Sequence, residues 1–588
     1  IDVGDALLNT NIGELAGDAY TTGAQNASFG YAALTANTTG SYNTGLGYKA
    51  LNASTTGNAN TGLGYDALRN NTTAANNTAV GMQSMEDNTT GADNTSVGHL
   101  ALANNTTANN NTAVGKAALQ ANTTGSPNTA VGYRSLYTNT TGGENTAIGY
   151  ESLYTNNGAN NVALGYKALR ANTTGSGNTG IGRDALEANT TASSNTAVGH
   201  NSLTSTTGGG NNTAVGNFAA GSNTTGNTNT AIGGDVLASQ TTGSQNTALG
   251  YKAMYAHTTG IQCVGIGVSA LQANTTTSEL TAVGAHSLQA NTTGTQNVAY
   301  GAWSLRFNTT GDKNTAAGYQ ALAQNSTADE NTAFGYNAAQ ANTTGASNTA
   351  VGSQALAANT TGSNNTAVGY QALDVATTAS NNTAVGYVAG SATTTGANNV
   401  FVGGAAGLKN TTGNENAIVG RDAFYENTTG AYNTAIGYQS LTANTTADYN
   451  TALGYYALRA NTTGTQNTAV SRAMQLNTTG SYNTSIGMYS TEQNTTGSYN
   501  SALGRSALNQ NTTGSQNTAI GHQALYANTT ANDNTAVGQR ALYANTTGAE
   551  NVGVGNSALG ANTTGDYNTA FGSRALDSAT TADQNTAF

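Results

Sequence analysis

The chain has 588 residues, of which only 8% are charged, and a net charge of -11 at pH 7. Ordinary globular proteins carry about 25% charged residues. Without a basic surface the chain cannot follow a phosphate backbone, so we expect no nucleic-acid partner. No apolar run is as long as a membrane helix, so we expect no membrane partner either.

A glycine recurs every 17 residues from Gly13 onward, and the unit reads roughly N-T-A-V-G-Y-Q-A-L-x-A-N-T-T-G-S-Q. The period falls one residue short twice, before Gly165 and at Ser471. We predict that the first short repeat loses its residue in the turn and that the second loses the bend glycine itself. A unit this short cannot bury its own apolar face, so the units must stack on one another. We therefore predict one continuous repeat array over residues 13–588, preceded by an irregular or degenerate segment over 1–12.

The N-T-A-V-G segment of each unit is predicted to be a strand that ends in a bend. Side chains alternate between the faces of a strand, so Thr129 and Val131 share one face. The valine position is restricted to large apolar residues, which favours the interior, and Val80 and Val131 are predicted core residues. The following glycine supplies a bend that a Cβ atom would block. The predicted bend glycines are Gly47, Gly64, Gly81 and Gly132.

The Y-Q-A-L segment follows the bend. Its first residue varies freely, so Tyr133 and Arg134 are expected to face outward. Its leucine is nearly constant, and we predict it to be the second core residue of each coil, as at Leu51, Leu119 and Leu136. Tyrosines follow three successive glycines at Tyr31, Tyr48 and Tyr65. These rings either stack between coils or form a contact surface for sugars.

The N-T-T-G segment has the composition of a turn. Its asparagines also lie in glycosylation sequons, once in nearly every unit. They either form an Asn/Thr ladder that closes the turns or carry glycans. The candidate glycosylation sites are Asn37, Asn71, Asn88, Asn105 and Asn122.

A 17-residue unit rich in Thr, Asn and Gly is too short and too turn-prone for paired helices. We predict an all-β fold, a parallel β-solenoid or β-roll of about 34 coils. At about 4.8 Å per coil it would be a rod of roughly 160 Å. Two large aliphatic side chains per coil supply only about 3–6 kcal/mol. This thin core favours packing of several chains.

No catalytic arrangement, metal-ligand cluster or cofactor motif is visible in the sequence, so we expect no enzyme. His99, His200 and His522 lie just after the bend glycine, far apart, and are expected to be solvated surface residues, as are His257 and His286. Cys263 replaces the asparagine of N-T-A-V-G. It is either a neutral variation of the repeat or the site of an interchain disulfide.

The N-T-A-V-G unit resembles the head repeats of trimeric autotransporter adhesins. The whole unit, with Y-Q-A-L and N-T-T-G, is similar to the repeat arrays of bacterial and phage tail-fibre-domain proteins. The resemblance covers nearly all of residues 13–588 and implies a left-handed solenoid, a homotrimer and a location outside the cell, on the cell surface or on a virion.

We therefore expect a structural fibre that serves as a stalk, sheath or adhesive spacer. Its main partner would be itself, as a homotrimer that continues end to end from an uncapped last coil. One alternative is a carbohydrate- or surface-binding shaft that contacts cell-surface glycans. A remote alternative is ice binding, which the absence of T-x-T and the predicted inward strand threonines oppose.

Overall fold

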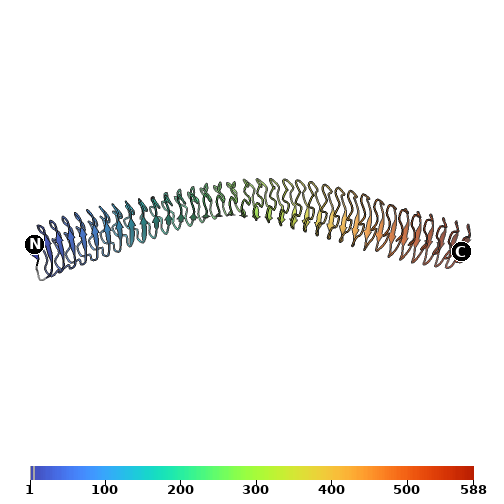
Figure 1. Cartoon of the computed structure of the whole chain (residues 1–588), viewed down its shortest axis with the longest axis horizontal. Helices are drawn as coiled ribbons and strands as arrows, with labels where there is room; N and C mark the ends of the chain where they lie inside the picture. Colours follow the sequence, from blue (N-terminus) through green and yellow to red (C-terminus); the bar gives the residue numbers. More distant parts are fainter. Residues whose placement is uncertain (1, 4–6) are drawn as a thin grey trace. The chain divides into compact units, whose positions relative to one another are not determined.

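The computed structural model describes residues 2–3 and 7–588, and within them it is all-β, without a helix. Each repeat forms one coil of a parallel β-solenoid, which confirms the predicted fold class. The chain divides into two compact units, Ile1–Thr295 and Gln296–Phe588. Figure 1 shows unit 1 in blue to green and unit 2 in green to red.

The strands of unit 1 are β1 (Asp2–Val3), β2 (Thr10–Ile12), β3 (Ala27–Phe29), β4 (Thr44–Leu46), β5 (Thr61–Leu63), β6 (Thr78–Val80), β7 (Thr95–Val97), β8 (Thr112–Val114), β9 (Asn128–Val131), β10 (Asn145–Ile148), β11 (Val162–Leu164), β12 (Thr179–Ile181), β13 (Thr196–Val198), β14 (Thr213–Val215), β15 (Thr230–Ile232), β16 (Thr247–Leu249), β17 (Val264–Ile266) and β18 (Thr281–Val283). The strands of unit 2 are β19 (Val298–Tyr300), β20 (Thr315–Ala317), β21 (Thr332–Phe334), β22 (Thr349–Val351), β23 (Thr366–Val368), β24 (Thr383–Val385), β25 (Val400–Val402), β26 (Ala417–Val419), β27 (Thr434–Ile436), β28 (Thr451–Leu453), β29 (Thr468–Val470), β30 (Thr484–Ile486), β31 (Ser501–Leu503), β32 (Thr518–Ile520), β33 (Thr535–Val537), β34 (Val552–Val554), β35 (Thr569–Phe571) and β36 (Thr586–Ala587).

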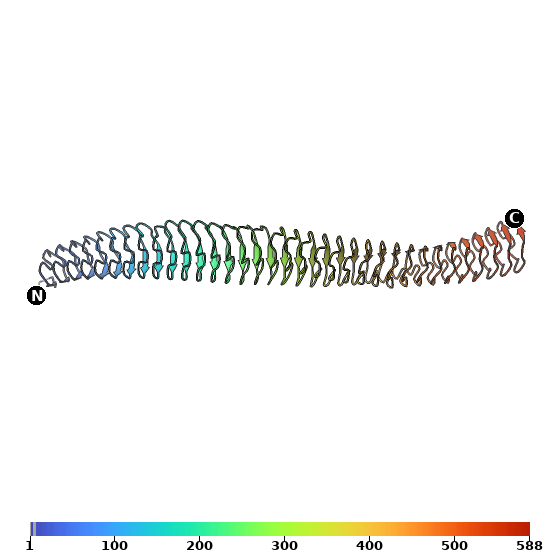
Figure 2. The same cartoon turned by 90° about the horizontal axis from the view of Figure 1, so that it is seen from above.

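From β2 onward the strands within each unit pair in parallel, each with the equivalent residues of the next coil. In unit 1, Ala130 of β9 pairs with Ala147 of β10. In unit 2, Ala435 of β27 pairs with Ala452 of β28. The strands of each unit follow one another along one side of its stack, with the loops beside them (Figure 2). The result is a sheet in which every row along the stack repeats one position of the 17-residue unit.

The N-terminal segment over residues 1–12 contains two strands. β1 pairs antiparallel with β2, and β2 pairs in parallel with β3. The parallel stack therefore begins at Thr10, inside the segment expected to be irregular. The part of that prediction that concerns residues 1 and 4–6 lies outside the described residues.

The strand faces lie opposite to the sequence prediction. Ala130 is fully buried, whereas Val131 is only half-buried, and Val80 has the same position in its coil. The prediction that Val80 and Val131 form the core is therefore wrong. The interior side of the strand is close to the leucine row, and in most coils it accepts only Ala, Gly or Ser. The outward position accepts side chains as large as that of Tyr300, which is 49% exposed.

The leucine row lies in the interior, as predicted. Leu51, Leu119 and Leu136 are fully buried, together with the alanines that precede the first two. One alanine and one leucine per coil fill a narrow interior. Burial of the leucine contributes about 1.5–3 kcal/mol to the free energy of unfolding in each coil.

Around β25 a large side chain lies in the alanine row and small residues lie in the leucine row. Phe401 takes the alanine position of β25 and is fully buried. Glycines take the leucine positions of the same coil and of the preceding one, and a Cβ atom on Gly390 would lie 2.6 Å from the Phe401 ring. A Cβ atom on Gly407 would also overlap this ring. The ring thus fills the space of the missing leucines, because a close-packed interior keeps its total volume.

The predicted bend glycines all have a backbone conformation that requires glycine. Their φ angles are +142° at Gly47, +140° at Gly64, +134° at Gly81 and +134° at Gly132. A Cβ atom on Gly132 would overlap the carbonyl of Gly149 in the next coil. The row of glycines therefore permits a backbone approach between coils that no other residue allows.

The first short repeat loses its residue in the turn, as predicted. Asn156-Asn157-Gly158 replaces N-T-T-G, and the Asn157 side-chain oxygen accepts hydrogen bonds from the Thr140 amide nitrogen (2.7 Å) and hydroxyl (2.9 Å). In regular coils a threonine carbonyl accepts that bond, as Thr140 O does from Thr123 N at 3.0 Å. Strand register continues unchanged, with Ala147 opposite Ala163.

The second short repeat loses its residue in the bend, but differently from the prediction. The bend position is retained: Ser471 takes the place of the glycine, with φ +73°, and its amide donates to Leu453 O at 2.7 Å. One of the two residues that normally separate the glycine from the interior alanine is missing. Ala473 and Met474 then resume the interior rows, and Val470 pairs with Ile486.

Candidate binding surfaces

Two rows of asparagine amides run through the interior of each unit. In one coil, Asn128 Nδ2 and Asn139 Nδ2 both donate to Gly142 O, at 3.0 and 2.9 Å. Asn139 Nδ2 also donates to Asn122 Oδ1 of the preceding coil at 3.0 Å. Asn128 Oδ1 accepts from the Asn145 backbone amide of the next coil at 3.0 Å. These bonds satisfy buried polar groups and tie each coil to its neighbours.

The candidate glycosylation sites belong to one of these rows. Asn122 Nδ2, to which a glycan would be attached, donates to Gly125 O and Asn105 Oδ1, both at 3.0 Å. A glycan on this nitrogen would displace these hydrogen bonds, so the arrangement opposes glycosylation of the folded coil. The alternative, an Asn/Thr ladder, is confirmed. The buried sites are Asn37, Asn71, Asn88, Asn105 and Asn122.

His257 replaces an asparagine of this row and is fully buried, so the expectation of a solvated histidine is wrong here. Its Nε2 lies 2.9 Å from Gly260 O and its Nδ1 lies 3.0 Å from Asn274 Nδ2. A carbonyl only accepts, so Nε2 carries the proton and Nδ1 accepts from the amide. Burial lowers the pKa of His257, which keeps the ring neutral.

Cys263 replaces an asparagine of the other row and is buried as a free thiol. Its Sγ lies 3.3 Å from Thr277 O. Burial raises the pKa of the thiol to about 11. A buried neutral thiol is a poor nucleophile, which favours the neutral variation over an interchain disulfide.

The outward side of the parallel strands forms a continuous surface in each unit, which we call the strand face. It consists of the first and third residues of the T-A-V segment in each repeat. The first residues form a row made mostly of threonines, and the third residues form a row made mostly of aliphatic side chains. Many of the aliphatic side chains are about two-fifths exposed, for example 37% at Val114 and 42% at Leu164, and others such as Val131 are half-buried. Across β2 to β36 neither row contains a charged residue. The variable size at the third position was the signal that could have revealed this face.

A tyrosine row lies just beyond the bend. The ring centroids of Tyr31 and Tyr48 are 5.3 Å apart, those of Tyr48 and Tyr65 are 5.0 Å apart, and the rings are stacked. The predicted stacking between coils is therefore confirmed. These rings are 39% to 50% exposed, and the Lys49 ammonium lies 5.3 Å from the Tyr48 centroid. Exposed flat rings beside a cation are chemically suited to contact with polar ligands.

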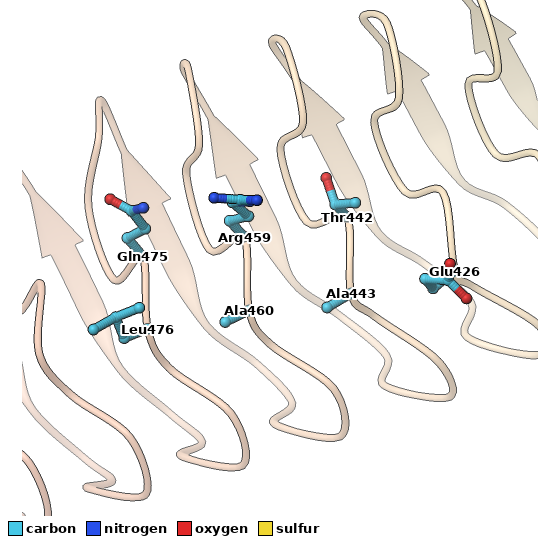
Figure 3. Close-up of a pocket in the computed structure, with 7 residues that line it drawn as sticks. All are labelled: Glu426, Thr442, Ala443, Arg459, Ala460, Gln475 and Leu476. Carbon is cyan, nitrogen blue, oxygen red and sulfur yellow. The ribbon is translucent and has the colours of Figure 1, made fainter.

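A shallow groove of about 400 Å³ crosses several coils of unit 2 (Figure 3). Ala443 and Ala460 form its floor, where neighbouring coils have the larger Glu426 and Leu476. Arg459 lies 4.6 Å from the Tyr456 ring, and Glu426 is paired with Lys409 at 2.7 Å. The Thr442 hydroxyl in this groove donates to the backbone carbonyl of Asp422 at 3.1 Å.

Within the described part of the chain, no group of three or more His, Cys, Asp and Glu residues could hold a metal ion. The same residues include no helix long and apolar enough to span a membrane. No protein-family model and no curated protein matches the sequence. The surfaces described above are therefore the basis for a functional proposal.

Proposed function

We propose that the protein is a structural fibre, used as a stalk, sheath or adhesive spacer outside the cell, on a cell surface or on a virion. The observation that carries the proposal is that the same hydrogen bonds between neighbouring coils recur throughout each unit. Backbone pairs, two asparagine rows and a turn threonine row all connect one coil to the next. The repeat thus supplies axial cohesion, as in other solenoids whose coils contact only their neighbours.

Self-association belongs to this proposal, with a homotrimer as its expected form. The sequence argument for several chains was a thin core, but alanine, leucine and paired amides fill the interior within one chain. The exposed aliphatic row is the stronger reason for association, because extended apolar surface is rarely left in water.

The fibre proposal can be tested by imaging and diffraction of the full chain. We expect thin filaments with an axial repeat of about 4.8 Å, the spacing of adjacent strands. Circular dichroism should report β-structure. Compact particles without this repeat, or a helical spectrum, would contradict the proposal.

A second candidate function is contact with cell-surface glycans, which the exposed tyrosine row favours. We expect substitution of Tyr31, Tyr48 and Tyr65 by alanine to abolish binding on a glycan array. The matched control replaces the stacked pair Tyr432 and Tyr449, whose centroids are 4.8 Å apart, on another row. Equal binding by both variants would exclude Tyr31, Tyr48 and Tyr65 as the contact.

A further inference from the structure

We propose that the strand face is the surface through which a second copy of this chain packs laterally. This inference rests on the proposed fibre function and specifies the surface and the partner. It places the aliphatic row of one copy, which includes Val97, Val114 and Val131, against the same row of another.

The distribution of charge supports this assignment. The chain has 17 Lys and Arg residues and 28 Asp and Glu residues, and none of them lies on the outward positions of β2 to β36. Charges occur instead beyond the bend and in the turns, for example at Lys116 and Glu144. Burial of the strand face would therefore desolvate no charged group, which is the main cost of burying a polar surface.

The size of the face matches a stable interface. A three-residue strand is about 10 Å long, and 17 strands at about 4.8 Å extend over about 80 Å. Each unit thus presents about 800 Å², which is about the share of one partner in a standard interface. The aliphatic row takes up about half of this face, and an exposed apolar strip of several hundred Å² in a soluble protein marks an interaction site.

The regular spacing identifies the partner as a second copy. Thr129 pairs with Thr146, and Val131 with Ile148, so both rows repeat once per coil. A partner that contacts every coil must repeat with the same spacing, and another copy does so. Two such sheets pack face to face at about 10 Å with side chains interleaved. Because both copies use the same surface, the contact is self-complementary and joins two copies, where the family resemblance implies three.

The test replaces Val97, Val114 and Val131 by lysine in the full chain. The matched control replaces Thr107, Thr124 and Thr141, which are exposed turn residues one per coil, also by lysine. Mass photometry and sedimentation velocity over a range of concentrations measure association. We expect the wild-type and Thr→Lys chains to form dimers, and the Val→Lys chain to associate at least tenfold more weakly, with unchanged β-structure.

A second variant with threonine at the three valine positions keeps β-propensity and decides the question if the lysine variant does not fold. It should also weaken association. Wild-type chains that stay single would overturn the interface. Equal association of the Val→Lys and Thr→Lys chains would also overturn it. So would a single wild-type chain that inhibits ice recrystallisation through an open strand face. Single but extended β-solenoids would overturn self-association and leave the role as a structural fibre intact, whereas loss of the extended β-form in wild type would overturn both.

Discussion

The two short repeats have each lost one residue, but at different positions in the coil. In unit 1 the lost residue belongs to the turn, and the Asn157 side chain supplies the acceptor that a backbone carbonyl supplies elsewhere. In unit 2 the lost residue belongs to the bend, and Ser471 adopts a positive φ where glycine is otherwise found. Both deletions leave the strand register and the interior rows in place.

The comparison shows which parts of a coil are fixed. Asn156 Nδ2 still donates to Gly158 O at 2.8 Å, and Met474 still occupies the leucine row. Interior rows are held by neighbours on both sides, whereas connecting segments contact solvent and can be rebuilt. Free energy of unfolding should therefore depend most on the interior and least on the turns.

The largest effect is expected for Leu136→Ala. Removal of a fully buried leucine leaves a cavity and should lower the local free energy of opening by about 2–5 kcal/mol. Amide hydrogen exchange in the coils around residue 136 measures this, because a solenoid can open locally. Val131→Ala in the same coil should cost about 1 kcal/mol or less. A larger loss for the valine would reverse the assignment of the strand faces.

Much of this architecture could be predicted from the repeat itself. The period predicts one coil per 17-residue repeat, the constant leucine indicates Leu136 as core, and the glycine indicates the bend at Gly132. The strand faces could not be assigned from hydrophobicity, because the narrow interior selects small Ala130 over larger Val131. A sequon likewise gives no information on whether Asn122 faces inward, which depends on amide pairing between coils.

The next effect distinguishes the regular bend from the short one. Gly132→Ser should destabilise its coil by about 1–3 kcal/mol, because φ +134° is strained for any side chain. Ser471→Gly should be neutral or slightly stabilising, since glycine relieves the positive φ of the short bend. Hydrogen exchange at each site measures both changes. A tolerated Gly132→Ser would show that the regular bend can relax as the short one does.

A smaller effect is expected at the short turn. Asn157→Ala removes the acceptor of the Thr140 amide and hydroxyl, and should cost about 0.5–1.5 kcal/mol, as for an ordinary hydrogen bond. The exposed Thr124→Ala in a regular turn is the control. If both substitutions have equal effects on exchange at Thr140 and Thr124, the side-chain acceptor is not what repairs the deletion.

The smallest effect concerns pH. Burial lowers the pKa of His257, so the unfolded coil binds a proton more readily than the folded one. Its stabilising contribution is complete above the unfolded pKa of about 6.5 and decreases as pH falls from there toward the lowered folded pKa. Local exchange should therefore accelerate between pH 7 and pH 5 beyond its intrinsic dependence.

His257→Asn restores the regular amide row and should remove this pH dependence. The control is His200→Asn, because the His200 ring is exposed. Persistence of the effect in the His257 variant would assign it to another group.

Because the partner of almost every residue is the equivalent residue one coil away, coil number is free to vary. Thr129 opposite Thr146 and Asn122 beside Asn139 would find the same partners after loss or gain of a whole repeat within a unit. Duplication or loss of 17-residue segments by genetic recombination would change the length of the stack in equal steps and leave its cross-section unchanged. The repeat is thus a unit of inheritance as well as of structure.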